Sequence, residues 1–107
     1  MNFDITPRAE REIERIANYW AENRDVGAEF FLRELEEAEK HLRTLPESGE
    51  AWRMRKNEVI RRWLLEGSST HLYYVYQARR ERILVVAVWG ARRRAPKVGT
   101  PLSSKRK

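Results

Sequence analysis

Seven consecutive apolar residues, ILVVAVW at positions 83–89, restrict the fold of this chain more than any other part of its sequence. A strand with one face in water alternates apolar and polar residues, whereas a run with no polar member is buried on both faces. The run therefore predicts a central strand of a sheet, with helices packed against one face. The sequence does not identify the cover of the other face, and a partner protein that fills an aromatic surface is one solution.

Two amphipathic helices are predicted before this strand, at residues 7–23 and 26–44. Thr6 and Pro7 fit the N-cap and the first helical position of the earlier helix. Apolar residues recur at the helical period in both segments, at Ala9, Ile13, Ile16, Ala17 and Trp20 and at Ala28, Phe31, Leu32, Leu35, Ala38 and Leu42. The acidic residues lie mainly off these stripes, so we interpret them, together with His41, as a solvated face.

Strands are predicted at residues 2–6, 59–66, 70–78 and 82–89, where β-branched and aromatic residues are enriched. LPESGEAW, at residues 45–52, is a turn-rich passage between the helices and the later strands. The links between the last three strands are short, which fits antiparallel hairpins and excludes crossover helices. The 107 residues are enough for one domain, predicted at residues 1–96, followed by a flexible basic tail at residues 97–107.

The composition excludes several classes of protein. The chain has no cysteine and only two histidines, His41 and His71, so we expect neither a structural zinc site nor any other cofactor. No run approaches the roughly 20 apolar residues that a membrane-spanning helix needs. The amino terminus lacks the basic and apolar regions of a signal peptide. The sequence therefore predicts a cytoplasmic protein with no membrane partner.

Charge is divided unequally between the two halves of the chain. Residues 1–50 contain 7 basic and 13 acidic residues, a net charge of −6, whereas residues 51–107 contain 15 basic and 3 acidic residues, a net charge of +12. Such a field favours an anionic partner, although general solubility is a simpler explanation. Arg92, Arg93 and Arg94 follow the central strand, and we interpret them as an edge that contacts carboxylates or phosphates.

Five passages occur in an order and spacing that resemble the RelE/ParE superfamily of bacterial toxins from type II toxin–antitoxin pairs. They are FDITPRAEREIERIANYW, LPESG, IRRWLL, LYYVY and VWGARR, and the resemblance extends to about Pro96. It implies an α+β fold in which an antiparallel sheet of about four strands packs against an N-terminal helical hairpin, in the order βααβββ. It also implies a cognate antitoxin that wraps the toxin and forms a hetero-oligomer with it.

Two branches of this superfamily share the fold but differ in activity, so the fold does not choose between them. The resemblance implies for one branch a ribosome-dependent endonuclease that cuts messenger RNA by activating a ribose 2′-hydroxyl. It implies for the other, ParE-like branch a toxin that poisons DNA gyrase. A last strand that ends in an apolar residue or histidine, a glycine and paired arginines is typical of the ParE-like branch, and VWGARR has this pattern.

Cleavage of RNA needs a proton acceptor and cations that stabilise the charge developing on the phosphate. If the chain is a nuclease acting on ribosome-bound messenger RNA, its candidate catalytic residues are Arg62, His71, Tyr73 and Arg92. Glu58 and Glu66 are further candidates for the base, but each also fits an ordinary surface or turn position. Arginines 61 and 62 are expected to converge with arginines 92 and 93 across the strand between them, which would form a phosphate-sized positive site.

Two departures from the nuclease branch favour the ParE-like alternative. The arginine expected within the third strand of the nucleases is Tyr73 here, and residues 95–107 contain no tyrosine or histidine. The residues expected to contact the target or the antitoxin are Arg61, Arg62, Trp89, Arg92, Arg93 and Arg94. A plain nucleic-acid-binding module without toxicity is a third interpretation, based on the basic half of the chain and its interleaved tyrosines.

Overall fold

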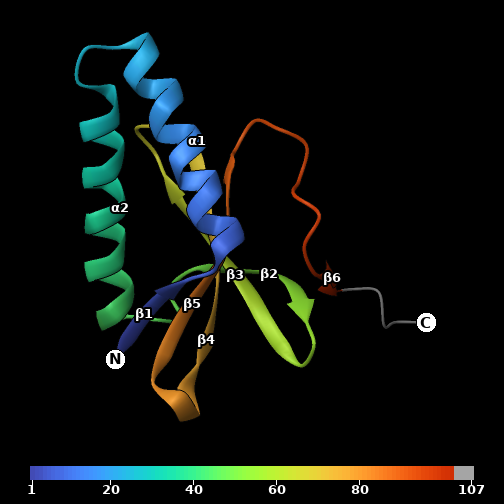
Figure 1. Cartoon of the computed structure of the whole chain (residues 1–107). Coiled ribbons are helices and arrows are strands. Elements are labelled where there is room, and N and C mark those ends of the chain that lie inside the picture. The colour runs from blue at the N-terminus through green and yellow to red at the C-terminus, as the bar shows by residue number, and fades with distance from the viewer. Residues whose placement is uncertain (103–107) are drawn as a thin grey trace.

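Two α-helices, one short 3-10 helix and six strands make up the computed structural model, which describes residues 1–102 (Figure 1). In chain order they are β1 (Asn2–Ile5), α1 (Pro7–Asn23), α2 (Gly27–Thr44), β2 (Glu50–Arg55), β3 (Glu58–Leu65), β4 (Thr70–Gln77), the short 3-10 helix η1 (Ala78–Arg80), β5 (Arg82–Gly90) and β6 (Thr100–Pro101). Both predicted helices and all four predicted strands are present, with ends within one residue of those predicted. The α+β fold class is confirmed.

The sheet contains six strands in the order β1-β5-β4-β3-β2-β6, rather than about four. Strands β2 to β5 pair antiparallel in sequence, and β6 returns to pair antiparallel with β2. At the other edge Asn2–Ile5 pairs in parallel with residues 82–85 of β5. The prediction of a wholly antiparallel sheet is therefore wrong at this edge. Parallel pairing is possible there because most of the chain lies between the two strands.

The two additional strands lie in segments whose composition is unlike that of a strand. β2 has the sequence EAWRMR, with no β-branched residue, and reaches β3 through a two-residue turn in which Lys56 has a φ of 56°. β6 has two residues, one of them Pro101, and pairs with Arg53 and Met54. Pairing with the rest of the sheet decides both segments against their local propensity.

The helical hairpin of α1 and α2 covers one face of the sheet (Figure 1). The Thr6 hydroxyl accepts a hydrogen bond from the Ala9 amide at 3.2 Å, which confirms the predicted N-cap. At Gly27, the first residue of α2, a Cβ would lie 2.4 Å from the Trp20 carbonyl oxygen, so the turn between the helices requires glycine. The predicted apolar stripes pack against the sheet, but Leu32 lies at the edge of its stripe and is 46% exposed.

The second face of the sheet has its own buried cluster, which the protein covers itself. Tyr73 faces Ala87 and Tyr74 faces Val85, so Val86 is an extra residue in β5 and this bulge turns two successive side chains toward the second face. The buried members of this cluster are Ile60, Tyr73, Val75, Leu84, Val86 and Ala87, and the residues packed against them are Trp52, Trp89 and Val98. The predicted central strand is confirmed, whereas the expected partner-filled surface on this face is not needed.

Residues 91–102, which we call the C-terminal strap, leave the end of β5 and return to the opposite edge of the sheet as β6 (Figure 1). Arg53 donates hydrogen bonds to the carbonyl oxygens of Pro96 and Val98, both at 3.2 Å. Gly99 has a φ of 69°, and a Cβ there would lie 2.6 Å from the Met54 carbonyl oxygen. Residues 97–102, which were predicted to lie in a flexible tail, thus make backbone contacts with β2 and include β6. Residues 103–107 of that prediction lie outside the described residues.

Candidate functional site

Strand direction keeps the two predicted arginine pairs apart. β3 and β5 flank β4 and both run antiparallel to it, so they run in the same direction and the start of one cannot lie beside the end of the other. Arg62 faces Tyr73 in the middle of β4, whereas the arginines that follow β5 lie beyond the first residue of β4. The predicted convergence of Arg61 and Arg62 with Arg92 and Arg93 is therefore wrong.

Arg61 and Arg62 also differ from each other, because successive side chains of a strand point to opposite faces. The Arg61 guanidinium donates to the carbonyl oxygens of Glu47 and Gly49, at 3.2 and 3.0 Å, and so holds the passage between α2 and β2. Arg62 lies on the second face, where its Nε pairs with the Glu50 carboxylate at 3.0 Å. Of the two arginines, Arg62 is the one placed beside other candidate site residues.

Four side chains on the second face, Trp52, Arg62, His71 and Tyr73, form what we call the aromatic cluster. The ring centroids of Trp52 and Tyr73 are 4.4 Å apart, and His71 meets Tyr73 edge-on at 5.7 Å. The Arg62 guanidinium lies 6.0 Å from the Trp52 ring. The structure thus brings together three of the four residues proposed for a nuclease and leaves the fourth, Arg92, outside.

Burial and neighbouring charges shift the pKa values of the titratable groups in this cluster. Burial lowers the pKa of His71 below its ordinary 6.5, and the positive charge of Arg62 lowers it further. Burial raises the pKa of Tyr73, although Arg62 and Arg53 oppose the rise. Burial acts to lower the pKa of Arg62, but its hydrogen bonds with Glu50 and Tyr73 leave that pKa raised. At pH 7 the cluster therefore holds a neutral imidazole, a protonated phenol and a cation.

The cation of the aromatic cluster is already engaged within the protein. Arg62 is paired with Glu50, and the neighbouring Arg53 donates to two carbonyl oxygens of the C-terminal strap. Tyr73 is 2% exposed because Trp52 and neighbouring strands pack around it. A phosphodiester would have to displace part of this cover before it reached the Tyr73 hydroxyl.

A second group of basic side chains lies at the end of β5, in residues 90–94, which we call the arginine turn. The Arg93 amide donates to the Gly90 carbonyl at 3.2 Å, and the Ala91 amide donates to the Ser69 carbonyl at 2.7 Å. All three arginines of the turn are exposed. Within residues 1–102 they form no ion pair. The turn therefore presents three uncompensated positive charges.

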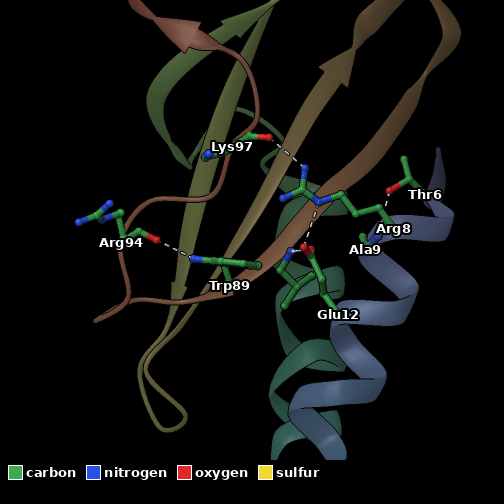
Figure 2. Close-up of polar contacts among 8 residues, drawn as sticks. Thr6, Arg8, Ala9, Glu12, Trp89, Arg94 and Lys97 are labelled. Carbon is green, nitrogen blue, oxygen red and sulfur yellow. Dashed lines mark hydrogen bonds and ion pairs between the residues drawn. The ribbon is translucent and has the colours of Figure 1, made fainter.

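Trp89 holds the arginine turn in place. Its Nε1 donates a hydrogen bond to the Arg94 carbonyl at 2.7 Å, which Figure 2 shows, and the Arg93 guanidinium lies 3.9 Å from the centre of its ring. The ring is half-buried, in contact with the cluster on the second face. Four predicted contact residues, Trp89 and the three arginines, consequently lie together, while Arg61 and Arg62 lie elsewhere in the sheet.

Glu12 is a buried carboxylate that the sequence interpretation assigned to the solvated face. It is 5% exposed, and it accepts hydrogen bonds from the Val88 amide at 2.8 Å and from Arg8 at 2.9 Å. Arg8 donates in turn to the Lys97 carbonyl at 3.1 Å (Figure 2). The Val88 amide is available because β1 pairs with β5 only as far as Val85. Glu12 lies one helical turn after Ala9, the first apolar residue of the stripe. That position was the signal in the sequence that this glutamate faces the sheet.

The remaining polar candidates have separate contacts. Glu58 accepts a hydrogen bond from Gln77 at 2.8 Å, and Glu66 is exposed in the turn after β3. Within the described residues neither of them forms a hydrogen bond or ion pair with the aromatic cluster. His41, which the pattern placed on a solvated face, is half-buried and stacks on Trp63 with ring centroids 4.4 Å apart.

The part of the chain that the structure describes, residues 1–102, contains no group of three or more His, Cys, Asp or Glu side chains placed to hold a metal ion. Neither of the helices described there is long and apolar enough to cross a membrane.

Comparison with known families gives one match. The model of a family described as "ParE toxin of type II toxin-antitoxin system, parDE" matches residues 3–95. The matched segment includes the helical hairpin, strands β2 to β5, the aromatic cluster and the arginine turn. A search of curated proteins found no similar sequence.

Proposed function

Because this chain belongs to the ParE toxin family of type II toxin–antitoxin systems, we propose that it arrests growth by binding DNA gyrase and trapping the complex in which gyrase has cleaved DNA. The proposed contact edge is the arginine turn together with Trp89. In the same proposal a cognate antitoxin neutralises the toxin by forming a hetero-oligomer with it in the cytoplasm.

The arginine turn is the observation that carries this proposal. Three exposed guanidinium groups extend from one short turn at the end of the central strand, and Trp89 restrains that turn through its ring and its Nε1. A restrained guanidinium offers a planar set of donors that matches carboxylate and phosphate groups. With no ion pairs to residues 1–102, these groups are open to an anionic surface on gyrase, its DNA or the antitoxin.

The aromatic cluster supports the endonuclease alternative less well. Its base, proton donor and cation are adjacent, which is the arrangement that general acid–base chemistry needs. However, Arg62 is paired with Glu50 and the Tyr73 side chain is buried. Arg92 lies beyond the far end of β4, so it supplies no second cation to this cluster.

A supercoiling assay with purified gyrase and toxin tests the proposal. We expect the toxin to inhibit supercoiling and to increase the amount of cleaved DNA. The double variant Arg92→Ala/Arg93→Ala should inhibit supercoiling at least about tenfold more weakly, since it loses charge-assisted hydrogen bonds to the target. The matched control is Arg79→Ala/Arg80→Ala, which removes the same charge from exposed positions in η1, at the opposite end of the sheet. This control should inhibit like the unchanged toxin.

A translation assay can contradict the gyrase proposal. If the toxin cuts messenger RNA on translating ribosomes and leaves gyrase unaffected, the gyrase proposal is wrong. Loss of that cleavage in Tyr73→Phe and Arg62→Gln variants would then assign the activity to the aromatic cluster. Equal inhibition of gyrase by the two double-arginine variants would instead show that the arginine turn is an ordinary solvated strand end.

The helical hairpin offers the antitoxin an exposed apolar surface. Ile5 and Leu32 border a groove of about 620 Å³ between β1, α1 and α2, and Tyr19, Val26 and Phe30 are exposed nearer the tip of the hairpin. We expect hydrogen exchange in α1 and α2 to slow when the antitoxin is added, because a bound helix or strand would shield these residues. Unchanged exchange throughout the hairpin and the sheet would contradict this part of the proposal.

A further inference from the structure

A groove of about 560 Å³ lies between the side of α1 and two turns at one end of the sheet, the arginine turn and the β3–β4 turn. Its lining consists of Arg15, Ile16, Tyr19, Trp20, Gly67, Ser68, Ser69, Thr70, Gly90, Arg92 and Arg93, and we call it the basic groove. A volume of this order is typical of sites that hold a small molecule or one unit of a polymer.

Positive charge reaches the basic groove from two sides. Arg15 comes from α1, and Arg92 and Arg93 come from the arginine turn, while none of the described lining residues is acidic. Within residues 1–102 these three arginines form no ion pair. The Glu34 carboxylate reaches the β3–β4 turn from α2, but it accepts two backbone amides of that turn, at 2.6 and 3.1 Å. The field in the groove therefore favours an anion.

Three consecutive residues with hydroxyl groups, Ser68, Ser69 and Thr70, also line the groove. Ser68 is 7% exposed, and its Oγ has no hydrogen-bond partner in the described part of the chain. A buried hydroxyl in that state is uncommon, because nearly all buried polar atoms are paired. An acceptor bound in the groove would give this donor a partner.

An aromatic wall stands beside the charged part of the groove. Tyr19 is 57% exposed, and its ring meets that of Trp20 edge-on with centroids 5.6 Å apart. An exposed aromatic ring next to arginines is the arrangement with which proteins stack a base while cations hold its phosphate.

We propose that the basic groove binds a nucleotide, with its phosphate between Arg15 and the arginine turn and its base against Tyr19. A carboxylate of an acidic peptide would also satisfy the arginines, but it would leave the exposed ring of Tyr19 without a stacking partner. A free nucleotide and a nucleotide within a DNA strand have the same chemistry here, so the test separates them. The inference goes beyond gyrase binding, because the toxin would bind the nucleotide in the absence of gyrase.

The test is a titration of full-length, nitrogen-15-labelled toxin followed by NMR, with deoxyadenosine monophosphate, deoxyadenosine and a short single-stranded DNA as probes. We expect the phosphate-bearing probes to shift the amide signals of residues 67–70 and Gly90, and deoxyadenosine to bind at least about tenfold more weakly. Arg15→Gln should reduce nucleotide affinity about tenfold. Arg11→Gln is the matched control, since Arg11 is an exposed arginine of the same helix that lines the other groove.

Similar affinity for the mononucleotide and the DNA would identify a free nucleotide as the ligand, and much tighter binding of the DNA would identify a strand. Absence of shifts in these amides, equal binding of deoxyadenosine, or equal affinities of the Arg15 and Arg11 variants would each overturn the inference. A growth-arrest assay of the Arg15→Gln variant keeps the two proposals distinct, because Arg15 lies outside the arginine turn that is proposed to contact gyrase. A toxin that inhibits gyrase but binds no nucleotide would leave the proposed function standing and remove this one.

Discussion

Trp89 occupies the position of β5 directly before the arginine turn, and its ring and its Nε1 make different contacts. The ring contacts the buried cluster of the second face and carries the Arg93 guanidinium, while Nε1 fixes the Arg94 carbonyl. Gly90 lies under the Arg93 side chain, where a Cβ would be 3.3 Å from its aliphatic carbons. Trp89 is thus a support for the basic residues that follow it, rather than a plain core residue.

Replacing Trp89 separates this support from core packing. We expect Trp89→Ala to lower the free energy of unfolding by about 2 kcal/mol, because a half-buried ring and one hydrogen bond are lost. A fully buried tryptophan would cost about 3 to 5 kcal/mol. Trp89→Phe should keep most of the stability but release the Arg94 carbonyl, so growth arrest should weaken more than stability does. Urea denaturation and a growth assay on both variants check this, and a fully toxic, stable Trp89→Ala variant would refute it.

His71 gives the toxin a predictable response to acid. Its pKa is lowered in the folded state, so below its ordinary value of 6.5 the unfolded chain binds a proton more readily than the folded chain. The contribution of His71 to stability is complete above pH 6.5 and is lost as the pH falls toward the folded pKa. His71→Gln should therefore flatten the decrease in melting temperature between about pH 7 and pH 5. An identical pH profile in the variant would show that other groups cause the decrease.

The residues of the candidate site could be predicted from the sequence better than their arrangement. Composition and order identified Trp89 and the three arginines after it, which lie together, and Arg62, His71 and Tyr73 also lie together. The error was to join the two groups. That requires the direction of each strand and the face of each side chain, and neither is contained in a list of basic residues. Glu12 was missed because its position on the apolar stripe, the one signal in the sequence, does not show the β5 amide that it meets.

At the scale of elements, the protein closes both faces of its sheet with different parts of one chain. Periodicity predicts the helices and the long strands well, because burial of one stripe or one face imposes the pattern directly. Periodicity does not predict β2 and β6, because neither segment has a strand-like pattern of its own. They form strands through pairing, in which Arg53 lies opposite Pro101. The strap that includes β6 covers the face for which a partner had been expected.

The contact between Glu12 and β5 should be worth more than an exposed helical carboxylate. Glu12→Ala leaves the buried Val88 amide without an acceptor, so we expect a loss of about 1 to 3 kcal/mol in the free energy of unfolding. Glu14→Ala, an exposed neighbour on α1, is the control and should change stability by less than about 0.5 kcal/mol. Chemical denaturation of both variants measures the difference. Equal stabilities would mean that water replaces the carboxylate at Val88 without cost.

Removing part of the strap should uncover the second face. A chain that ends at Lys97 loses β6, the packing of Val98 and one hydrogen bond from Arg53, and we expect it to be about 2 to 3 kcal/mol less stable. It should also bind a hydrophobic dye more strongly. A chain that ends at Leu102 retains every described contact of the strap and serves as the control. If the two truncated chains melt at the same temperature, the strap does not stabilise the fold.

At the scale of the whole molecule, charge and fold divide the chain in the same way. The two helices belong to the half with a net charge of −6, and strands β3 to β5 with the arginine turn belong to the half with a net charge of +12. The arginine turn therefore belongs to the strongly positive half, while the exposed surface of the hairpin is apolar and acidic.

This division predicts a salt dependence that is specific to the arginine turn. Association of the toxin with gyrase–DNA should slow about tenfold or more between low and high salt, because screening removes electrostatic steering. The Arg92→Ala/Arg93→Ala variant should show a clearly shallower dependence than Arg79→Ala/Arg80→Ala. Stopped-flow or surface-binding measurements at several salt concentrations check this. Parallel salt dependences would place the steering charge elsewhere on the molecule.

The parallel pairing of β1 with β5 has a consequence for how a cell makes this protein. β1 completes its edge of the sheet only beside residues 82–85, so its partner is synthesised long after it. Until the ribosome has released that segment, β1 and the helix side of β5 cannot form, and contacts so distant in sequence also form slowly once the chain is free. Interrupted synthesis would thus yield fragments that lack both the closed sheet and the arginine turn. If the arginine turn is the target contact, as proposed, the order of translation would by itself keep an unfinished chain from reaching its target.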